Sequence, residues 1–353
     1  MRQDRRDWPG ALEQYNEGLR IARSITVTDS SPVAIQKNKI AQVFSARNQP
    51  GDKQKALDEY REALKLLTQQ FDENLSDATL ISNIALTHRR IGDLLLDENP
   101  DEAQQEFEAA VEARRRLYRR DPGNANWRIG LATDIIPLGD VLTRKKTGFP
   151  GLRTYNEAVQ IVEAIVLNDP TSTEWESRLA ALHAKRGDVL FDQGQQRLKN
   201  PDPPEAASSR FMGNALDRYR DAAQRYESLL IKAKSPPYRE LFDVRRKIGD
   251  VLVRRNNHQE ALQAYQVASN VAVEAAATQR VVDWQIELSN AVEQAGDDLR
   301  AGDSALMKLA NSYYQKALEI LDVAANNERD NHDLQSRRSA LGAKIKAQQP
   351  MAQ

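Results

Sequence analysis

The chain has 353 residues, of which 40% are hydrophobic and 29% are charged, and its 50 basic residues nearly cancel its 51 acidic residues to leave a formal net charge of -1. A balance this close to zero predicts no general attraction to nucleic acid or to an anionic membrane. The absence of cysteine excludes disulfide bonds, thiolate nucleophiles and cysteine-bound metals.

The first predicted element is a helix over about residues 9–25, and its buried stripe introduces a motif that recurs along the chain. The motif is a small residue, an aromatic residue four positions later and a small residue three positions beyond that. Positions i, i+4 and i+7 share one face of a helix, so each copy predicts a buried stripe. The copies are Ala11, Tyr15 and Gly18; Ala56, Tyr60 and Ala63; Ala103, Phe107 and Ala110; Gly151, Tyr155 and Ala158; Ala215, Tyr219 and Ala222; Ala261, Tyr265 and Ala268; and Ala310, Tyr314 and Ala317.

A second kind of helix precedes most of these stripes and carries a Gly-Asp pair. Trp127, Trp175 and Trp284 each stand 12 residues before the Gly of their unit, which is about three helical turns. The pairs are separated by 47, 48, 62 and 47 residues, and a regular period of this size predicts stacked helix pairs that bury their apolar faces against one another. The pairs are Gly92-Asp93, Gly139-Asp140, Gly187-Asp188, Gly249-Asp250 and Gly296-Asp297.

Together the two motifs resemble the tetratricopeptide (TPR) repeat family, whose unit is a pair of antiparallel helices with Gly on the first helix and Ala, an aromatic residue and Ala on the second. The match is clearest between residues 248–252 and 260–268. The resemblance implies an all-α, right-handed α-solenoid of about seven antiparallel helix pairs. The period exceeds the family's usual length of about 34 residues, which predicts helices of about 16 to 20 residues. This long form resembles arrays attached to bacterial signalling ATPases and caspase-like (CHAT-type) peptidases.

We expect residues 1–330 to form one continuous array. It opens halfway through a repeat, so either the chain is a fragment or another segment covers its first helix. The longest spacing exceeds its neighbours by about 15 residues, and the prolines Pro201, Pro203 and Pro204 predict a surface loop at about 195–213. That loop is either a tolerated insertion or a binding element. Residues 331–347 follow the first-helix pattern with Lys346 in place of Gly, which predicts a solvated capping helix, and residues 348–353 are expected to be a disordered tail.

The sequence contains no recognisable catalytic, cofactor or metal motif. Its four histidines, His88, His183, His258 and His332, do not have metal-ligand spacing, and neither a Gly-rich nucleotide loop nor a nucleophile elbow occurs. We therefore expect no enzyme, no cofactor and ordinary surface or packing roles for the histidines. The basic runs at 114–120 and 245–247 lie among acidic residues, which favours exposed helix faces over phosphate contacts.

In the tetratricopeptide family the first helices line the concave side, and the residue after the Gly points into the groove. The resemblance implies a partner-binding groove lined by Arg89, Arg90, Asp93, Leu96, Ile136, Asp140, Lys185, Asp188, Phe191, Arg246, Lys247, Asp250 and Asp297. An Asp in every unit disfavours the peptides that the family holds by a C-terminal carboxylate. Two interpretations remain open. The charges either form i,i+4 pairs, such as Arg89 with Asp93, and a register-holding ladder between repeats, or they bind a partner of mixed charge with Leu96, Ile136 and Phe191 as apolar anchors.

The prediction for function is a non-catalytic protein-protein interaction scaffold, the sensing or docking module of a larger signalling or defence assembly. Its partner is a protein or peptide, or an effector domain of the same larger chain, and it binds the concave face or the inserted loop. The alternatives are a receptor for a peptide or small molecule and a structural oligomerisation module. The start of the chain lacks the apolar run of a signal peptide, and no stretch of about 18 apolar residues occurs, so we expect a cytoplasmic protein with no membrane or nucleic-acid partner.

Overall fold

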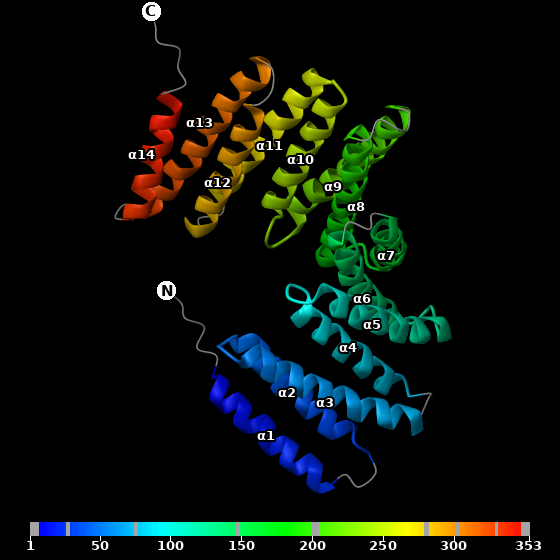
Figure 1. Ribbon diagram of the computed structural model, residues 1–353. Helices are drawn as coiled ribbons and strands as arrows, with labels where there is room; N and C mark the ends of the chain where they lie inside the picture. Colours follow the sequence, from blue (N-terminus) through cyan, green and yellow to red (C-terminus); the bar gives the residue numbers. More distant parts are fainter. Residues whose placement is uncertain are drawn as a thin grey trace, which may run out of the picture. The chain divides into compact units, whose positions relative to one another are not determined.

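The computed structural model describes residues 7–25, 29–73, 77–145, 149–199, 205–278, 282–300, 304–328 and 331–346. Every regular element within these residues is an α-helix, and consecutive helices lie side by side in pairs (Figure 1). The predicted all-α array of helix pairs is therefore confirmed. The helices are 15 to 28 residues long, so the long period is taken up by long helices.

The contacts divide the chain into two compact units, residues 1–168 and 169–353. The continuous array over residues 1–330 stays a prediction. In a repeat array each repeat contacts only its neighbours, so no shared core holds all the repeats together.

The first unit contains seven helices within its described residues. These are α1 (Trp8–Ile25), α2 (Ser31–Arg47), α3 (Asp52–Glu73), α4 (Ala78–Leu95), α5 (Pro100–Arg120), α6 (Ala125–Arg144) and α7 (Phe149–Asn168). The even-numbered helices are the first helices of the repeats, and the odd-numbered helices are the second helices. Helices α4, α5 and α6 each begin after an N-cap residue. The side chains of Asp77, Asn99 and Asn124 each accept a hydrogen bond from a backbone N–H of the first turn.

The second unit also contains seven helices within the residues that are described. These are α8 (Thr173–Lys199), α9 (Glu205–Lys232), α10 (Tyr238–Arg254), α11 (His258–Thr278), α12 (Val282–Leu299), α13 (Ser304–Asn327) and α14 (His332–Lys346). Six of the seven predicted stripes are buried, whereas Ala11, Tyr15 and Gly18 of α1 are only half-buried. Phe107 and Tyr265 are 0% and 4% exposed, and the alanines on either side of them are fully buried.

The predicted loop at 195–213 is wrong, because most of those residues are helical. Helix α8 continues to Lys199 and α9 begins at Glu205, which leaves only residues 200–204 outside the described part of the chain. The added turns pack against each other: the buried Ser208 hydroxyl donates to the Gly194 carbonyl at 2.9 Å. Proline interrupts a helix at its own position and restricts the residue before it, so a short proline cluster is compatible with helix close by on both sides. The extra residues therefore lengthen one helix pair (Figure 1).

The last described helix, α14, occupies most of the range in which a capping helix was expected. Leu334 and Leu341 are 0% and 3% exposed, so this helix buries an apolar edge against the array. The expected disordered tail, 348–353, lies outside the described residues.

Candidate functional site

The Gly of each Gly-Asp pair lies against the aromatic ring of the second helix in its own repeat. A Cβ atom added to Gly139, Gly187 or Gly249 would come 2.5 Å from a tyrosine ring carbon, and one added to Gly92 would come 2.7 Å from Phe107. Distances this short are far inside van der Waals contact. The repeated Gly is therefore required for the close approach of the two helices at the aromatic residue. The five contacts are Gly92 with Phe107, Gly139 with Tyr155, Gly187 with Tyr219, Gly249 with Tyr265 and Gly296 with Tyr314.

The Asp of the pair is bonded to the hydroxyl of that same tyrosine, which the sequence analysis did not foresee. In four repeats the tyrosine donates to the carboxylate of the residue after the Gly, at 2.6 to 2.7 Å. Each carboxylate is thereby held in a defined orientation by its own repeat. The pairs are Tyr155 with Asp140, Tyr219 with Asp188, Tyr265 with Asp250 and Tyr314 with Asp297. One signal in the sequence could have predicted this bond. In four of the five repeats that have the Gly-Asp pair, the aromatic residue of the second helix is a tyrosine, which has a hydroxyl to donate.

Two repeats in the first unit lack one member of the Asp-Tyr pair: one has the Asp without a tyrosine, and the other has a tyrosine without the Gly-Asp pair. Asp93 follows Gly92, but the ring facing that Gly is Phe107, which has no hydroxyl, and burial raises the pKa of Asp93. Asp93 instead accepts from Arg89 at 3.0 Å. In the preceding repeat Tyr60 is buried, and burial raises its pKa while the nearby Arg90 acts in the opposite direction.

Two of the Asp-Tyr pairs in the second unit are each contacted by a lysine of the following first helix. Lys247 of α10 donates to Asp188 at 2.6 Å, and its ammonium group lies 5.8 Å from the centre of the Tyr219 ring. Lys344 of α14 repeats the arrangement with Asp297 at 2.7 Å and Tyr314 at 4.6 Å. We call these two groups the Asp-Tyr-Lys clusters. Each cluster connects the first helices of two neighbouring repeats, as the ladder interpretation expects.

Lys344 was missed because α14 was interpreted as a solvated cap without a Gly. The helix nevertheless supplies the second Asp-Tyr-Lys cluster, and Lys344 also donates to Glu293 at 2.7 Å. Burial alone would raise the pKa of Asp297, but the bonds from Lys344 and Tyr314 lower it overall. The signal was available in the sequence: Lys344 stands two positions before the residue that replaces the Gly, as Lys247 stands two positions before Gly249.

In the first unit a buried carboxylate connects two first helices. Asp134 of α6 is 1% exposed and lies 2.8 Å from Arg114 and 3.2 Å from Arg89 of α4. Burial raises the pKa of Asp134, and the two guanidinium groups act against that increase. The predicted i,i+4 pairs are also present, Arg89 with Asp93 at 3.0 Å and Arg246 with Asp250 at 2.8 Å. Arg89 is therefore occupied by structural contacts.

The thirteen predicted groove residues do not form one described surface, because six lie in the first unit and seven in the second. Within each unit they lie on first helices, none is buried, and we call the surface they occupy the first-helix face. The apolar candidates Leu96, Ile136 and Phe191 are half-buried, so each presents part of its side chain to solvent. Asp93 has the largest accessible fraction of the set, although the protein atoms around its carboxylate partly desolvate it and so raise its pKa.

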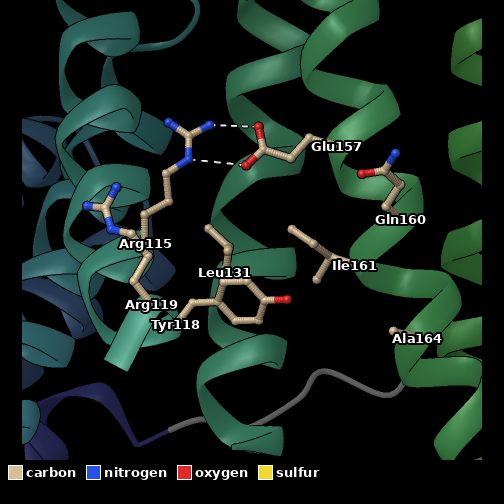
Figure 2. A pocket seen from close by; sticks show the side chains of 8 residues that line it. All are labelled: Arg115, Tyr118, Arg119, Leu131, Glu157, Gln160, Ile161 and Ala164. Carbon is tan, nitrogen blue, oxygen red and sulfur yellow. Dashed lines mark hydrogen bonds and ion pairs between the residues drawn. The ribbon is translucent and has the colours of Figure 1, made fainter. Parts of the chain in front are cut away.

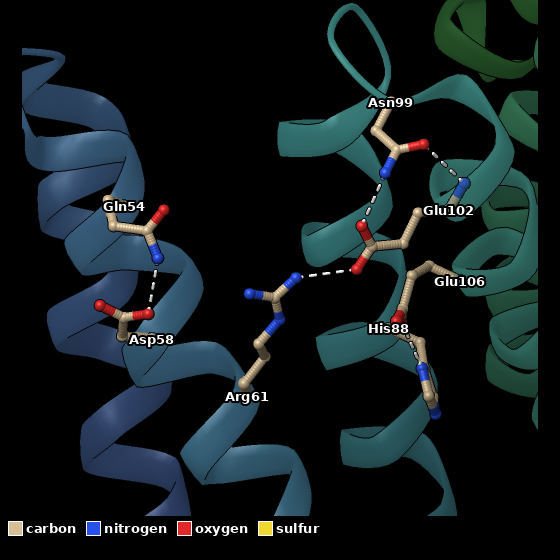
Figure 3. A network of polar contacts seen from close by, with 7 residues as sticks. All are labelled: Gln54, Asp58, Arg61, His88, Asn99, Glu102 and Glu106. Carbon is tan, nitrogen blue, oxygen red and sulfur yellow. Dashed lines mark hydrogen bonds and ion pairs between the residues drawn. The ribbon is translucent and has the colours of Figure 1, made fainter.

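Two of the histidines, His88 and His183, take part in packing between a first and a second helix, and His332 is exposed. His88 is 2.6 Å from Glu106 of α5, beside the Arg61 to Glu102 bond of 2.8 Å that links α3 and α5 (Figure 3). His183 is 4% exposed, and its burial lowers its pKa to about 3. No cluster of three or more histidine and carboxylate residues suited to a metal ion occurs in the part of the chain that is described.

Comparison with known proteins found similarity only to solved structures, at the level of the fold. No protein-family model matches the chain, and no curated protein matches it. Solved structures similar to it include BtubC from P. vanneervenii (15% identity, 75% of this chain and 91% of that chain, TM-score 0.49) and the apo form of RapI (13% identity, 89% and 97%, TM-score 0.49). Another is YrrB, described as a TPR protein with an unusual peptide-binding site (17% identity, 74% and 93%, TM-score 0.41). Among the described residues, no helix has the length and apolar character needed to span a bilayer.

Proposed function

We propose that this chain is a non-catalytic protein-interaction scaffold that binds a protein or peptide partner on the first-helix face of its repeats. The observation that supports the proposal is the row of oriented, partly exposed carboxylates on that face. The Asp188, Asp250 and Asp297 side chains are 41%, 30% and 38% exposed, although each accepts a hydrogen bond from a buried tyrosine. Groups that are held in place before binding lose little conformational freedom when a partner arrives.

Internal repetition separates the residues that serve the fold from those that can provide specificity. The Gly and the Asp recur in five repeats, where the Gly contacts the aromatic ring, and in four of them the Asp also accepts a bond from the tyrosine. The residue four positions after the Gly differs in each unit, and it is Leu96, Thr143, Phe191, Val253 or Arg300. A partner without internal repetition is recognised through such differences, so we assign specificity to this variable column.

The partner in this proposal carries both charge types and at least one apolar anchor. Lys247 and Arg246 already neutralise Asp188 and Asp250, so the face has no strong excess of either sign. Half-buried apolar residues such as Phe191 supply the contact area that usually dominates such interfaces. The carboxylates and their partners supply orientation and exclude wrongly charged segments.

We further infer that the scaffold is the docking or sensing module of a larger cytoplasmic signalling or defence assembly. The support for this is the 47-residue period, which resembles arrays attached to bacterial signalling ATPases and caspase-like peptidases. Its partner in that case includes an effector domain, carried by the same larger protein or by a separate chain.

The test is affinity isolation of partners with the full chain and with two matched pairs of variants. Phe191→Asp and Val253→Asp change the variable column, while Ile231→Asp and Val267→Asp place the same charge on side chains that are 93% and 42% exposed on second helices. Circular dichroism establishes that all four variants are folded. We expect the column variants to lose partners that the second-helix variants retain. Recovery of the same partners by all four variants contradicts the assignment to the first-helix face.

A further inference from the structure

A cavity of about 310 Å³ lies between the second helices α5 and α7 of the first unit, and none of the predicted groove residues lines it (Figure 2). Its floor is Leu131 of α6, which is 1% exposed, with Ile161 of α7 at 8%. Ala164 and the ring of Tyr118 continue the apolar wall. The volume is at the lower end of the range found for ligand-binding pockets, which begins near 300 Å³.

One end of the cavity is closed by an ion pair between the two second helices. Arg115 of α5 donates to Glu157 of α7 through two bonds, Nε to Oε1 at 3.1 Å and Nη2 to Oε2 at 2.7 Å. Figure 2 shows this pair at one end of the cavity, with Tyr118, Ile161 and Ala164 lying toward the other. The paired side chains fix the separation of α5 and α7 at this point, so the cavity is held open by a defined contact.

The rim of the cavity is polar, exposed and biased toward positive charge. Arg119 and Gln160 are exposed at the rim, whereas the floor is buried. Two arginines and one glutamate line the cavity, and residues 114–120 of α5 contain five arginines and no acidic residue. Arg119 is 63% exposed and contacts Glu112 at 2.7 Å, an exposed ion pair of the kind that contributes little to stability and exchanges readily for another carboxylate.

We propose that this cavity is a second binding site, which takes an acidic protein segment that inserts one bulky apolar side chain between α5 and α7. The apolar side chain packs on the half-buried Tyr118 and Ala164, above the buried Leu131 and Ile161, and a neighbouring carboxylate of the segment accepts hydrogen bonds from Arg119. An apolar floor with a cationic rim matches this combination, since the apolar side chain meets apolar groups and the carboxylate meets a positive charge. The site is separate from the first-helix face, so it does not depend on the function proposed above.

The test uses the full chain with labelled Ile and Leu methyl groups, observed by NMR, and three synthetic tripeptides with blocked ends. The probe is Asp-Phe-Asp, and the controls are Lys-Phe-Lys, which reverses the charge, and Asp-Ala-Asp, which removes the apolar group. We expect Asp-Phe-Asp to shift the methyl signals of Leu131 and Ile161 in a saturable manner and to leave those of Ile248 in α10 unchanged. The two controls are expected to produce at most a small fraction of these shifts.

Charge reversal at the rim provides the matched variants. Arg119→Glu is expected to weaken binding of Asp-Phe-Asp by about tenfold or more, because a charge-assisted hydrogen bond is replaced by repulsion. Arg153→Glu reverses an exposed arginine of α7 that does not line the cavity, and it is expected to leave binding unchanged. Leu96→Ala on the first-helix face is also expected to leave it unchanged, which separates this site from the proposed groove.

Three results would overturn the proposal. The first is an equal response to all three tripeptides, and the second is binding that survives Arg119→Glu. The third is an equal shift of the same methyl signals by inorganic phosphate, which would make the cavity a general anion site with no use for its apolar floor.

Discussion

Tyr265 donates a hydrogen bond of 2.7 Å to Asp250, while its ring lies against Gly249, the residue that precedes Asp250 in the chain. One side chain of the second helix thus contacts two consecutive residues of the first helix, through its ring and through its hydroxyl. The same relationship occurs at Tyr155, Tyr219 and Tyr314. It explains why Gly and Asp recur as a pair.

Removing the hydroxyl should weaken the repeat without disturbing the ring contact. Tyr265→Phe is expected to destabilise the second unit by about 1 kcal/mol, because the carboxylate of Asp250 loses a donor but keeps Arg246 and solvent. The urea midpoint at neutral pH measures the change. An unchanged midpoint would show that water replaces the hydroxyl at no cost.

The reverse substitution is available in the repeat that lacks the hydroxyl. Phe107→Tyr places a donor near Asp93, whose pKa burial now raises, and should stabilise the first unit by up to about 1 kcal/mol. The pKa of Asp93, followed by NMR, should fall in the variant. A lower urea midpoint together with an unchanged Asp93 pKa would mean that the packing around Phe107 has no room for the oxygen.

The repeated Gly should be intolerant of even one methyl group. Gly249→Ala brings a Cβ to 2.5 Å from the Tyr265 ring, so it is expected to destabilise the protein by about 1 to 3 kcal/mol despite the better helix propensity of Ala. Gly342 in α14 is the matched control, since an added Cβ there meets nothing within 4 Å and Gly342→Ala should stabilise by up to about 1 kcal/mol. Equal effects at the two glycines would contradict the close-approach explanation.

The lysine of α14 should decide how firmly that helix is attached. Lys344→Met removes the bonds to Asp297 and Glu293 and is expected to increase hydrogen exchange across α14. It should also raise the pKa of Asp297, because the present pKa is lowered by Lys344. Lys346→Met changes an exposed residue of the same helix and should affect neither observable. Equal protection of α14 in both variants would rule out this role for Lys344.

A carboxylate at the start of α3 should make part of the stability depend on acid pH. Arg47 and the backbone N–H of Gln49 bond to Asp52, and they lower its pKa from 3.8 to about 2. Because the folded-state pKa lies below the unfolded value, this stabilisation is complete above about pH 4 and is lost as the pH falls through about 2. The difference in urea midpoint between wild type and Asp52→Asn should therefore shrink toward zero over that range.

Asp58→Asn is the control for this pH dependence, because Asp58 is an exposed carboxylate of the same helix that accepts a bond from Gln54 at 2.7 Å. Its difference from wild type should be small at every pH. A constant difference for Asp52→Asn between pH 4 and pH 2 would contradict the lowered pKa.

The sequence was sufficient for the helix pairs because their signal is local and repeated. Ala103, Phe107 and Ala110 share one helix face by spacing alone, and all three are fully buried. The prediction of a loop at 195–213 was wrong because it used only local sequence rules, which were sufficient for the helix pairs but not for this segment. Local rules identified the prolines, but they could not show that Gly194 of α8 and Ser208 of α9 contact each other where the two helices are extended.

The period of the Gly-Asp pairs by itself determined the fold class, the pairing of helices and the positions of the first-helix residues, because burial of an apolar stripe depends on the spacing of nearby side chains. Only the tertiary structure decided what the Asp does. Tyr219 and Asp188 are 31 residues apart in the chain, and Lys247 is 59 residues from Asp188. These groups meet only when two antiparallel helices and the next repeat are packed together, so their hydrogen bonds depend on distances that no local spacing encodes.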